Sequence, residues 1–215
     1  MRCGAVVVAA GSGQRFGGPK QFAMLDGRVV AARSIELCRS VADVVVLVAP
    51  NDAQELTHGA DQVVEGGATR SESVRRGLMA LPDDVDTVIV HDAARPLATE
   101  RLFFAVVAEL SDEEVDAAIP GLEPTDTIKR VVARDGRRWV VETLDRTELA
   151  TIQTPQAFRV KSLRRAHAAH AEATDDAALI EAMGGTVVVV PGEQENLKLT
   201  SPGDLELAER MMERR

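Results

Sequence analysis

The chain has 215 residues, of which 45% are hydrophobic and 27% charged, and its formal net charge is -9. This composition is typical of a globular protein, and the length predicts one domain over residues 1–215 with a sizeable core. The acidic balance excludes a general nucleic-acid binder, no apolar stretch is long enough to span a membrane, and two cysteines cannot build a disulfide scaffold. We therefore expect a cytoplasmic protein with no nucleic-acid or membrane partner.

The most informative segment is a glycine-rich loop close to the start of the chain. The apolar run 5–10 predicts a buried strand, and it leads directly into a loop that contains Gly11 and Gly13. Glycines let a backbone turn sharply, so that free N–H groups can surround an anion. Arg15 and Lys20 add positive charge where a phosphate would sit. The segment therefore predicts a polyphosphate site that neutralises its ligand during chemistry.

The residues of this loop also bear on three other interpretations. A dinucleotide-binding fingerprint needs a third glycine where this chain has Phe16, and Pro19 prevents an immediate helix. A P-loop needs Ser or Thr after its lysine, but Gln21 follows Lys20. A simple glycine turn between a strand and a helix stays open, although such a turn does not require Arg15 and Lys20.

Strand-like and helix-like segments alternate along the rest of the chain. Apolar runs predict strands over residues 44–49, 62–65, 87–91, 117–120 and 186–190. Capping residues predict helices that begin near residues 69–72, 99–102, 174–176 and 201–204, the third ending at 184–185. The alanine-rich segment 166–173, which includes His167 and His170, predicts a surface helix. This alternation favours an α/β fold with a doubly wound, mostly parallel Rossmann-like sheet.

One segment departs from the alternation. Runs with strand character over residues 127–133 and 138–144 flank residues 134–137, which contain Asp135 and Gly136. Asp-Gly between two such runs is a strong signal for a β-hairpin. An inserted hairpin that buries little against its own subunit usually packs on another. We therefore predict that residues 121–153 form a protruding β-arm through which the protein forms a homodimer.

Two further clusters carry residues suited to nucleotide chemistry. Asp92 follows the strand predicted over residues 87–91, and ligands of open α/β sheets bind beyond such strand ends. Its carboxylate suits Mg²⁺, although a turn capped by Asp92 and paired with Arg95 is the alternative. Gly66 and Gly67 precede a predicted helix N-terminus, where anions are attracted, but this signal alone is weak.

The remaining candidates are dispersed over the second half of the chain. Thr127 and Lys129 lie on the first predicted hairpin strand, Arg146 follows the second, and Lys198 lies near the end. These residues meet one phosphate only if the fold brings them together. Otherwise, their cations form a solvated basic face.

Several motifs occur in one order from about residue 5 to residue 207. They are the loop at 9–21, the segment 66–74, the His-Asp-Ala-Ala-Arg-Pro run at 91–96 and the segment 125–129. Residues 145–146, the Gln-Thr-Pro-Gln run at 153–156, and the segments 174–176 and 196–198 follow. Together they closely resemble the 2-C-methyl-D-erythritol 4-phosphate cytidylyltransferase family. The loop is shared with many nucleotidyltransferases, whereas the runs at 91–96 and 153–156 are specific.

This resemblance implies transfer of CMP from CTP to 2-C-methyl-D-erythritol 4-phosphate, with release of pyrophosphate, in non-mevalonate isoprenoid biosynthesis. It implies a homodimer that uses Mg²⁺ or another divalent cation, with Asp92 contacting the ribose and the metal. Thr127 and Arg146 would be contributed by the partner's arm. The implied catalytic residues are Arg15, Lys20, Arg146 and Lys198. The implied substrate-binding residues are Ala9, Ala10, Gly11, Gly13, Gly67, Arg70, Ser73, Asp92, Arg95, Thr127 and Thr174.

The alternatives are a cytidylyltransferase for another polyol phosphate, such as ribitol 5-phosphate, and a nucleotide-binding sensor without turnover. Four cations at the implied catalytic positions argue against the sensor. Ala32 and Arg33 stand where relatives tend to place a bulky or acidic residue and histidine, and the chain has no tyrosine. Cytosine recognition would therefore depend on the backbone and on small side chains.

Overall fold

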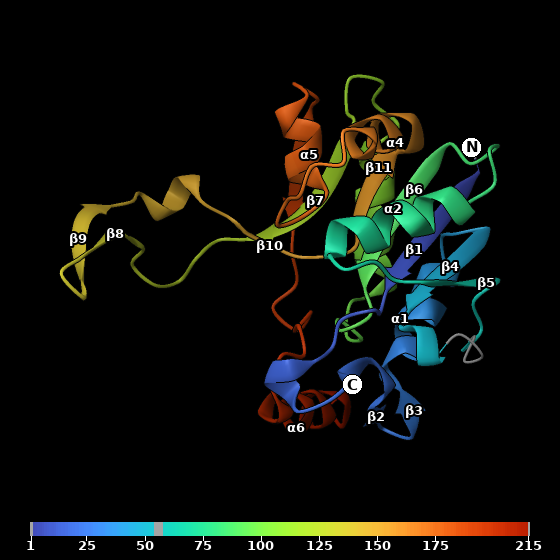
Figure 1. The fold of residues 1–215 in the computed structure, drawn as a ribbon, viewed down its shortest axis with the longest axis horizontal. Helices are drawn as coiled ribbons and strands as arrows, with labels where there is room; N and C mark the ends of the chain where they lie inside the picture. The colour runs from blue at the N-terminus through green and yellow to red at the C-terminus, as the bar shows by residue number, and fades with distance from the viewer. Residues whose placement is uncertain (1, 54–57, 215) are drawn as a thin grey trace.

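The computed structural model describes residues 2–53 and 58–214, and an eight-stranded sheet lies at its centre (Figure 1). β1 (Cys3–Val8) runs parallel to β4 (Val44–Ala49) and β6 (Thr87–Asp92), and β5 (Gln62–Glu65) is parallel to β4. Beyond β6 lie the antiparallel β11 (Gln156–Arg159) and then β7 (Ala117–Leu122). β12 (Val187–Pro191) and the short β10 (Thr151–Ile152) pair with β7. The predicted mostly parallel α/β sheet is confirmed.

Helices cover both faces of the sheet because successive strand side chains enter two different cores. In β1, Ala5 and Val7 join the core that contains residues of α1 (Val30–Arg39) and α3 (Glu100–Glu109). Val6 joins the core formed with α2 (Arg70–Ala80), α4 (Val160–Ala168) and α5 (Ala177–Ala182). A sheet buried on both faces requires near-continuous apolar strands, which is the pattern that the sequence shows.

Side-chain caps begin three of the predicted helices. Thr69 Oγ1 accepts a hydrogen bond from Glu72 N at 3.1 Å at the start of α2, and Thr99 Oγ1 caps α3. α6 (Pro202–Met212) begins with a capping box of Ser201 and Asp204. It belongs to a third cluster with Leu25 of the short hairpin β2 (Met24–Leu25) and β3 (Arg28–Val29). These starts follow the local signals because a cap satisfies backbone N–H groups within a few residues.

The structure corrects several of the predicted boundaries. β1 begins at Cys3 and ends at Val8, because Cys3 already pairs with Thr87 whereas Ala9 and Ala10 lead into the glycine loop. β11 and β10 were not predicted as strands at all. The helix predicted over residues 166–173 ends at Ala168, since His170 has a φ of 52° and the chain leaves helical geometry there.

The predicted hairpin is present as β8 (Lys129–Arg134) and β9 (Arg137–Thr143), joined by two residues with positive φ. It forms a separate two-stranded sheet that projects away from the main sheet (Figure 1). Every residue of β9 is exposed, including the large apolar side chain of Trp139. The two ends of segment 121–153 pair with each other at the sheet, Leu122 opposite Thr151. The projecting part of the arm therefore begins beyond β7 and ends before β10.

No helix in the described ranges is both long and apolar enough to cross a membrane.

Candidate functional site

The glycine loop, the end of β6 and the start of α2 meet at one edge of the sheet. Val8, the last residue of β1, lies directly opposite Asp92, the last residue of β6. Gly66 follows β5, and its N–H donates to Ala49 O at the end of β4 at 2.9 Å. Because β1, β4, β5 and β6 are parallel, their carboxyl ends bring these segments together, as open α/β sheets do at ligand sites.

The glycine loop is held in a closed shape by its own backbone. Phe16 N donates to Gly13 O at 2.8 Å, and Gly18 N donates to the same oxygen at 3.3 Å. Gly13 has a φ of 64°, and a Cβ there would overlap Gly18 O, so only glycine fits without strain. Gln21 is buried, and its Nε2 donates to Gly11 O at 3.1 Å, which ties the loop to the segment that follows it.

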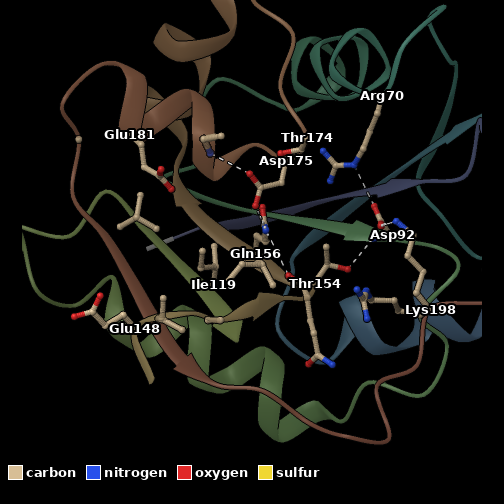
Figure 2. Close-up of a pocket in the computed structure, with 18 residues that line it drawn as sticks. Arg70, Asp92, Ile119, Glu148, Thr154, Gln156, Thr174, Asp175, Glu181 and Lys198 are labelled. Atoms are coloured by element: carbon tan, nitrogen blue, oxygen red, sulfur yellow. Dashed lines mark hydrogen bonds and ion pairs between the residues drawn. The ribbon is translucent and has the colours of Figure 1, made fainter. Parts of the chain in front are cut away.

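Two cavities open beside this loop and share one wall. The loop cavity, about 420 Å³, is bounded by residues 8–12, 67–70 and 92–94 together with Lys20, Gln21 and Ser73. The sheet cavity, about 920 Å³, is lined by residues of β7, β10, β11, β12 and α5, among them Ile119, Gln156 and Glu181 (Figure 2). Arg70, Asp92 and Lys198 line both cavities. Groups bound in the two cavities would therefore approach each other at these three side chains.

Asp92 is the electrostatic centre of the shared wall. Its Oδ1 lies 3.3 Å from Arg70 Nε, and its Oδ2 lies 2.5 Å from Lys198 Nζ (Figure 2). Burial by itself would raise the pKa of Asp92, but the charges of Arg70 and Lys198 outweigh burial and hold that pKa well below its usual range. Asp92 is therefore ionised at neutral pH.

Lys20 completes a group of cations around the loop cavity. Its Nζ donates to Leu199 O at 2.5 Å, and its side chain is partly buried. Burial and then the charge of Lys198 lower the pKa of Lys20. A low-dielectric environment strengthens the attraction between an ammonium group and a phosphate. Lys20 is thus placed to act on an anion in the loop cavity.

The irregular segment that carries Lys198 is fixed by a buried network. Gln153 Oε1 accepts hydrogen bonds from Glu193 N at 3.0 Å and from Asn196 Nδ2 at 3.3 Å. Asn196 Nδ2 also donates to Thr154 O at 2.9 Å, and Arg95 Nη1 donates to Asn196 O at 2.7 Å. Residues far apart in the sequence therefore hold Lys198 next to Asp92.

His91 is fully buried next to Asp92 and does not line either cavity. Thr154 Oγ1 lies 3.0 Å from His91 Nδ1 and accepts a hydrogen bond from Asp92 N at 3.0 Å. Burial lowers the pKa of His91 to about 4, although the charge of Asp92 opposes the shift. The imidazole is neutral at pH 7, which suits a structural role rather than that of a base.

Because the folded-state pKa of His91 lies below its unfolded value of about 6.5, the unfolded state binds the proton first as the pH falls. Stability is fully present above about pH 6.5, and we expect about 3 kcal/mol to be lost as the pH falls to about 4. Urea unfolding of wild type and His91→Asn in metal-free buffer checks this. The variant loses this part of the pH dependence, and an equal slope in both proteins contradicts the assignment.

The structure brings most of the predicted site residues into the two cavities. Ala9, Ala10, Gly11, Gly67 and Ser73 line the loop cavity. Arg95 and Thr174 line the sheet cavity, and Arg70, Asp92 and Lys198 line both. Gly13 shapes the loop without lining either cavity.

Besides Gly13, three predicted residues lie outside both cavities of their own chain. Arg15 is exposed on the loop, close enough to Lys20 for its charge to lower the pKa of Lys20. Thr127 and Arg146 are exposed on the arm, where Arg146 Nη1 donates to Thr125 O. The arm therefore does not deliver these two side chains to the site of the same chain.

Sequence reasoning missed some residues and misplaced one. Thr154, Gln156 and Asp175 line the sheet cavity, and Gln156 Nε2 donates to Asp175 Oδ2 at 2.9 Å (Figure 2). All three lie in motifs that were noticed but given no individual role. His167 is buried against Asp176 rather than exposed on a surface helix, because its side chain points from α4 toward the start of α5.

The donor set for a divalent cation is small. The described residues contain no group of three or more His, Cys, Asp or Glu side chains that could hold a metal by themselves. Among the residues that the structure describes, Asp92 is the one carboxylate that lines the loop cavity. A cation bound through one carboxylate and several substrate phosphate oxygens is the arrangement that Mg²⁺ favours, so the residues fit a metal that arrives with a polyphosphate.

The comparison of the sequence with known families and proteins agrees with this geometry. A profile of the family described as 2-C-methyl-D-erythritol 4-phosphate cytidylyltransferase matches residues 3–214. A protein of that name from Frankia casuarinae is 46% identical and covers 99% of this chain and 82% of its own length. The bifunctional enzyme IspD/IspF of Clavibacter michiganensis is 44% identical over 99% of this chain, which spans 55% of that enzyme.

Solved structures give the same result. The 4-diphosphocytidyl-2C-methyl-D-erythritol synthase of Anaerococcus prevotii is 30% identical, with a TM-score of 0.84 over 99% of this chain and 98% of that one. The 2-C-methyl-D-erythritol 4-phosphate cytidylyltransferase of Thermus thermophilus is 33% identical, with a TM-score of 0.80 over 99% and 100%. The chain described here belongs to the 2-C-methyl-D-erythritol 4-phosphate cytidylyltransferase family.

Proposed function

We propose that this protein transfers CMP from CTP to 2-C-methyl-D-erythritol 4-phosphate and releases pyrophosphate, because its relatives are named as cytidylyltransferases of this acceptor. The observation that carries the proposal is the pair of cavities with a common wall of Arg70, Asp92 and Lys198. A two-substrate transfer needs two adjoining compartments whose contents meet at one point. CTP occupies the loop cavity, and the polyol phosphate occupies the sheet cavity.

The reaction needs charge neutralisation more than a general base. The acceptor is a phosphate monoester whose second pKa is about 6, so it is mostly a dianion at neutral pH. One of its oxygens bonds to the α-phosphorus of CTP, and the bond from that phosphorus to the bridging oxygen breaks as pyrophosphate leaves with the electron pair. Lys20 and Lys198 reduce the repulsion between the two anions and stabilise the charge on the leaving group. Arg15 approaches the same phosphates from the loop.

Contacts to CTP come largely from the backbone and from small groups. Ala9, Ala10, Gly11 and Gly67 bound the loop cavity, where cytosine and the phosphates are held through main-chain groups. Gly67 N donates to Ser73 Oγ at 3.0 Å, and this pair lies at the start of α2. Arg70 Nη2 has no hydrogen-bond partner among the described residues, so one donor remains for a substrate. Arg95 and Thr174 serve the acceptor.

We also propose that the reaction uses Mg²⁺ or another divalent cation, held by Asp92 and by phosphate oxygens of CTP. When bound, the cation withdraws charge from the phosphates. Both carboxylate oxygens of Asp92 already have a cationic partner, so Asp92 would hold the metal in place of its contact with Lys198. The protein is proposed to act in the cytoplasm, where thiols stay reduced, and both Cys3 and Cys38 are free and buried.

The acceptor assay tests the proposed activity directly. We expect pyrophosphate release from CTP in the presence of Mg²⁺ with 2-C-methyl-D-erythritol 4-phosphate, and turnover at least about 10²-fold lower with ribitol 5-phosphate. Faster turnover of ribitol 5-phosphate would assign the protein to the other polyol. CTP binding measured by calorimetry without turnover of either acceptor would make it a nucleotide sensor.

The arm supports a further proposal, a homodimer in which each arm completes the partner's site. Thr127 and Arg146 lie on the segment that projects away from the main sheet (Figure 1). Trp139 on β9 of this segment is exposed. An apolar side chain on a projecting hairpin is typical of a surface that another subunit covers. In this arrangement the partner's Thr127 and the partner's Arg146 contact the acceptor phosphate.

Subunit complementation gives a sharp prediction for this dimer. Lys20→Ala and Arg146→Ala are each nearly inactive, because every homodimeric site lacks one cation. When the two variants exchange subunits, each mixed dimer has one intact site, so activity rises to about a quarter of the wild-type value by symmetry. Mixing purified proteins before the assay tests this. No recovery after exchange, or full activity of a monomer in sedimentation, contradicts the dimer.

A further inference from the structure

A chain of side-chain contacts links the common wall of the two cavities to His167 on α4. His167 is 2% exposed, and its Nε2 lies 2.9 Å from Asp176 Oδ1. Asp176 is fully buried, and its Oδ2 accepts a hydrogen bond from Arg70 Nη1 at 2.7 Å. Arg70 Nε then reaches Asp92, the partner of Lys198 (Figure 2). Two contacts therefore connect His167 to Arg70 in the wall shared by the two cavities, and two more lead on to Lys198.

Arg70 depends on Asp176 for its position. Arg70 contacts two carboxylates at once, Asp92 through Nε and Asp176 through Nη1. These two contacts fix the plane of the guanidinium group. Since the Asp92 contact is the longer one, at 3.3 Å against 2.7 Å, the Asp176 contact is the stronger anchor. A guanidinium held at two points can present its free Nη2 in one direction only.

Asp176 in turn depends on His167. A buried carboxylate requires hydrogen-bond donors for both oxygens, and Oδ1 faces His167 Nε2. Without the Nε2–H group of His167, Oδ1 has lost its donor. The carboxylate of Asp176 then rotates toward another donor, and Oδ2 moves away from Arg70. Neither His167 nor Asp176 lines the loop cavity or the sheet cavity, so their effect on the reaction is indirect.

We propose that His167 is a positioning residue for nucleotidyl transfer, which acts through Asp176 to hold Arg70 against Asp92. This inference rests on the proposed function, because the reaction occurs at the wall that Arg70 helps to form. A misplaced Arg70 leaves Asp92 free to turn toward Lys198 alone, and both the free Arg70 donor and the Lys198 ammonium lose their orientation toward the phosphates. The loss falls on kcat more than on KM, since most contacts that bind the two substrates lie elsewhere in the cavities.

The test compares two replacements of His167 that differ in one N–H group. His167→Leu fills the buried space without a donor, whereas the amide Nε2 of His167→Gln reaches the place of the imidazole Nε2. We expect kcat to fall about tenfold in His167→Leu, with KM for both substrates within about threefold, and His167→Gln to recover most of the loss. Leu163→Val is the matched control, because it removes buried volume from the same helix without touching the chain of contacts.

A double-mutant cycle shows whether the effect passes through Arg70. Arg70→Lys removes the guanidinium group that contacts both carboxylates. In this background we expect the further change His167→Leu to lower kcat less than about twofold. The proposal is overturned if His167→Leu lowers kcat tenfold in the Arg70→Lys background. It is also overturned if His167→Gln or Leu163→Val lowers kcat as much as His167→Leu does. If His167→Leu does not fold, His167→Met takes its place. If wild type is active and His167→Leu has the same kcat, this inference is refuted and the proposed function stands. If wild type itself is inactive, the proposed function is refuted.

Discussion

We expect Lys20→Ala to lower kcat by about 10²–10³, the loss typical of removing one donor that stabilises transition-state charge. Lys20 lines the loop cavity beside the glycine loop, and its side chain is partly buried. Within the described residues its side chain donates one hydrogen bond, to Leu199 O, so we expect the variant to keep its fold. Because the charge acts on the transferring and leaving phosphates, KM for CTP changes much less than kcat.

Steady-state kinetics with saturating CTP and acceptor measure this loss, and thermal unfolding shows that the variant is folded. Lys161→Ala is the matched control, since Lys161 is an exposed lysine on α4 and its removal leaves kcat unchanged. Lys20→Arg keeps the charge but changes its shape, so partial activity is expected. Turnover near the wild-type rate in Lys20→Ala rules out the role assigned to this lysine.

Asp92→Asn is expected to lower kcat/KM by about 10²–10³ and to destabilise the protein by about 3 kcal/mol. The amide removes the negative charge that Arg70 and Lys198 share, so two cations are left facing each other across the wall. It also removes the carboxylate proposed to meet the metal. Both cavities are affected, because all three side chains line both.

The pH dependence of stability distinguishes this charge effect from a packing effect. The folded-state pKa of Asp92 lies below its unfolded value of about 3.9, so its contribution is present above that pH and is lost as the pH falls further. Urea unfolding in metal-free buffer therefore gives a constant difference between wild type and Asp92→Asn from about pH 7 to pH 5. Below about pH 4 the difference shrinks, and a difference that is equally large at pH 3 points to packing instead.

Local signals predicted the parts of the fold that depend on neighbouring residues. Thr69 and Thr99 cap the helices that they were expected to begin, and Asp135 and Gly136 form the hairpin turn. β11 was missed because its four residues follow Pro155 without an alternating pattern, and its partners β6 and β7 lie tens of residues away. The pairing of strands that lie far apart in the sequence cannot be recognised from the pattern of a few neighbouring residues.

The candidate site was also predicted only in part, where its residues follow strand ends. The glycine loop and Asp92 were found from strand ends, because β1 and β6 deliver them to one edge. The meeting of Lys198 with Asp92 follows from the buried network of Gln153 and Asn196, which residue spacing does not reveal, and only the family resemblance suggested it. His167 was misplaced because its partner, Asp176, lies beyond an irregular stretch.

The common wall of the two cavities makes the two substrates thermodynamically coupled. A ligand in the loop cavity that draws Lys198 or Arg70 toward itself alters the charges that a ligand in the sheet cavity meets. By linkage, the factor by which CTP changes the affinity for the acceptor equals the factor by which the acceptor changes the affinity for CTP. An inhibitor that binds in one cavity therefore changes the affinity of the other cavity for its substrate. Its potency depends on the concentration of the substrate that it does not displace.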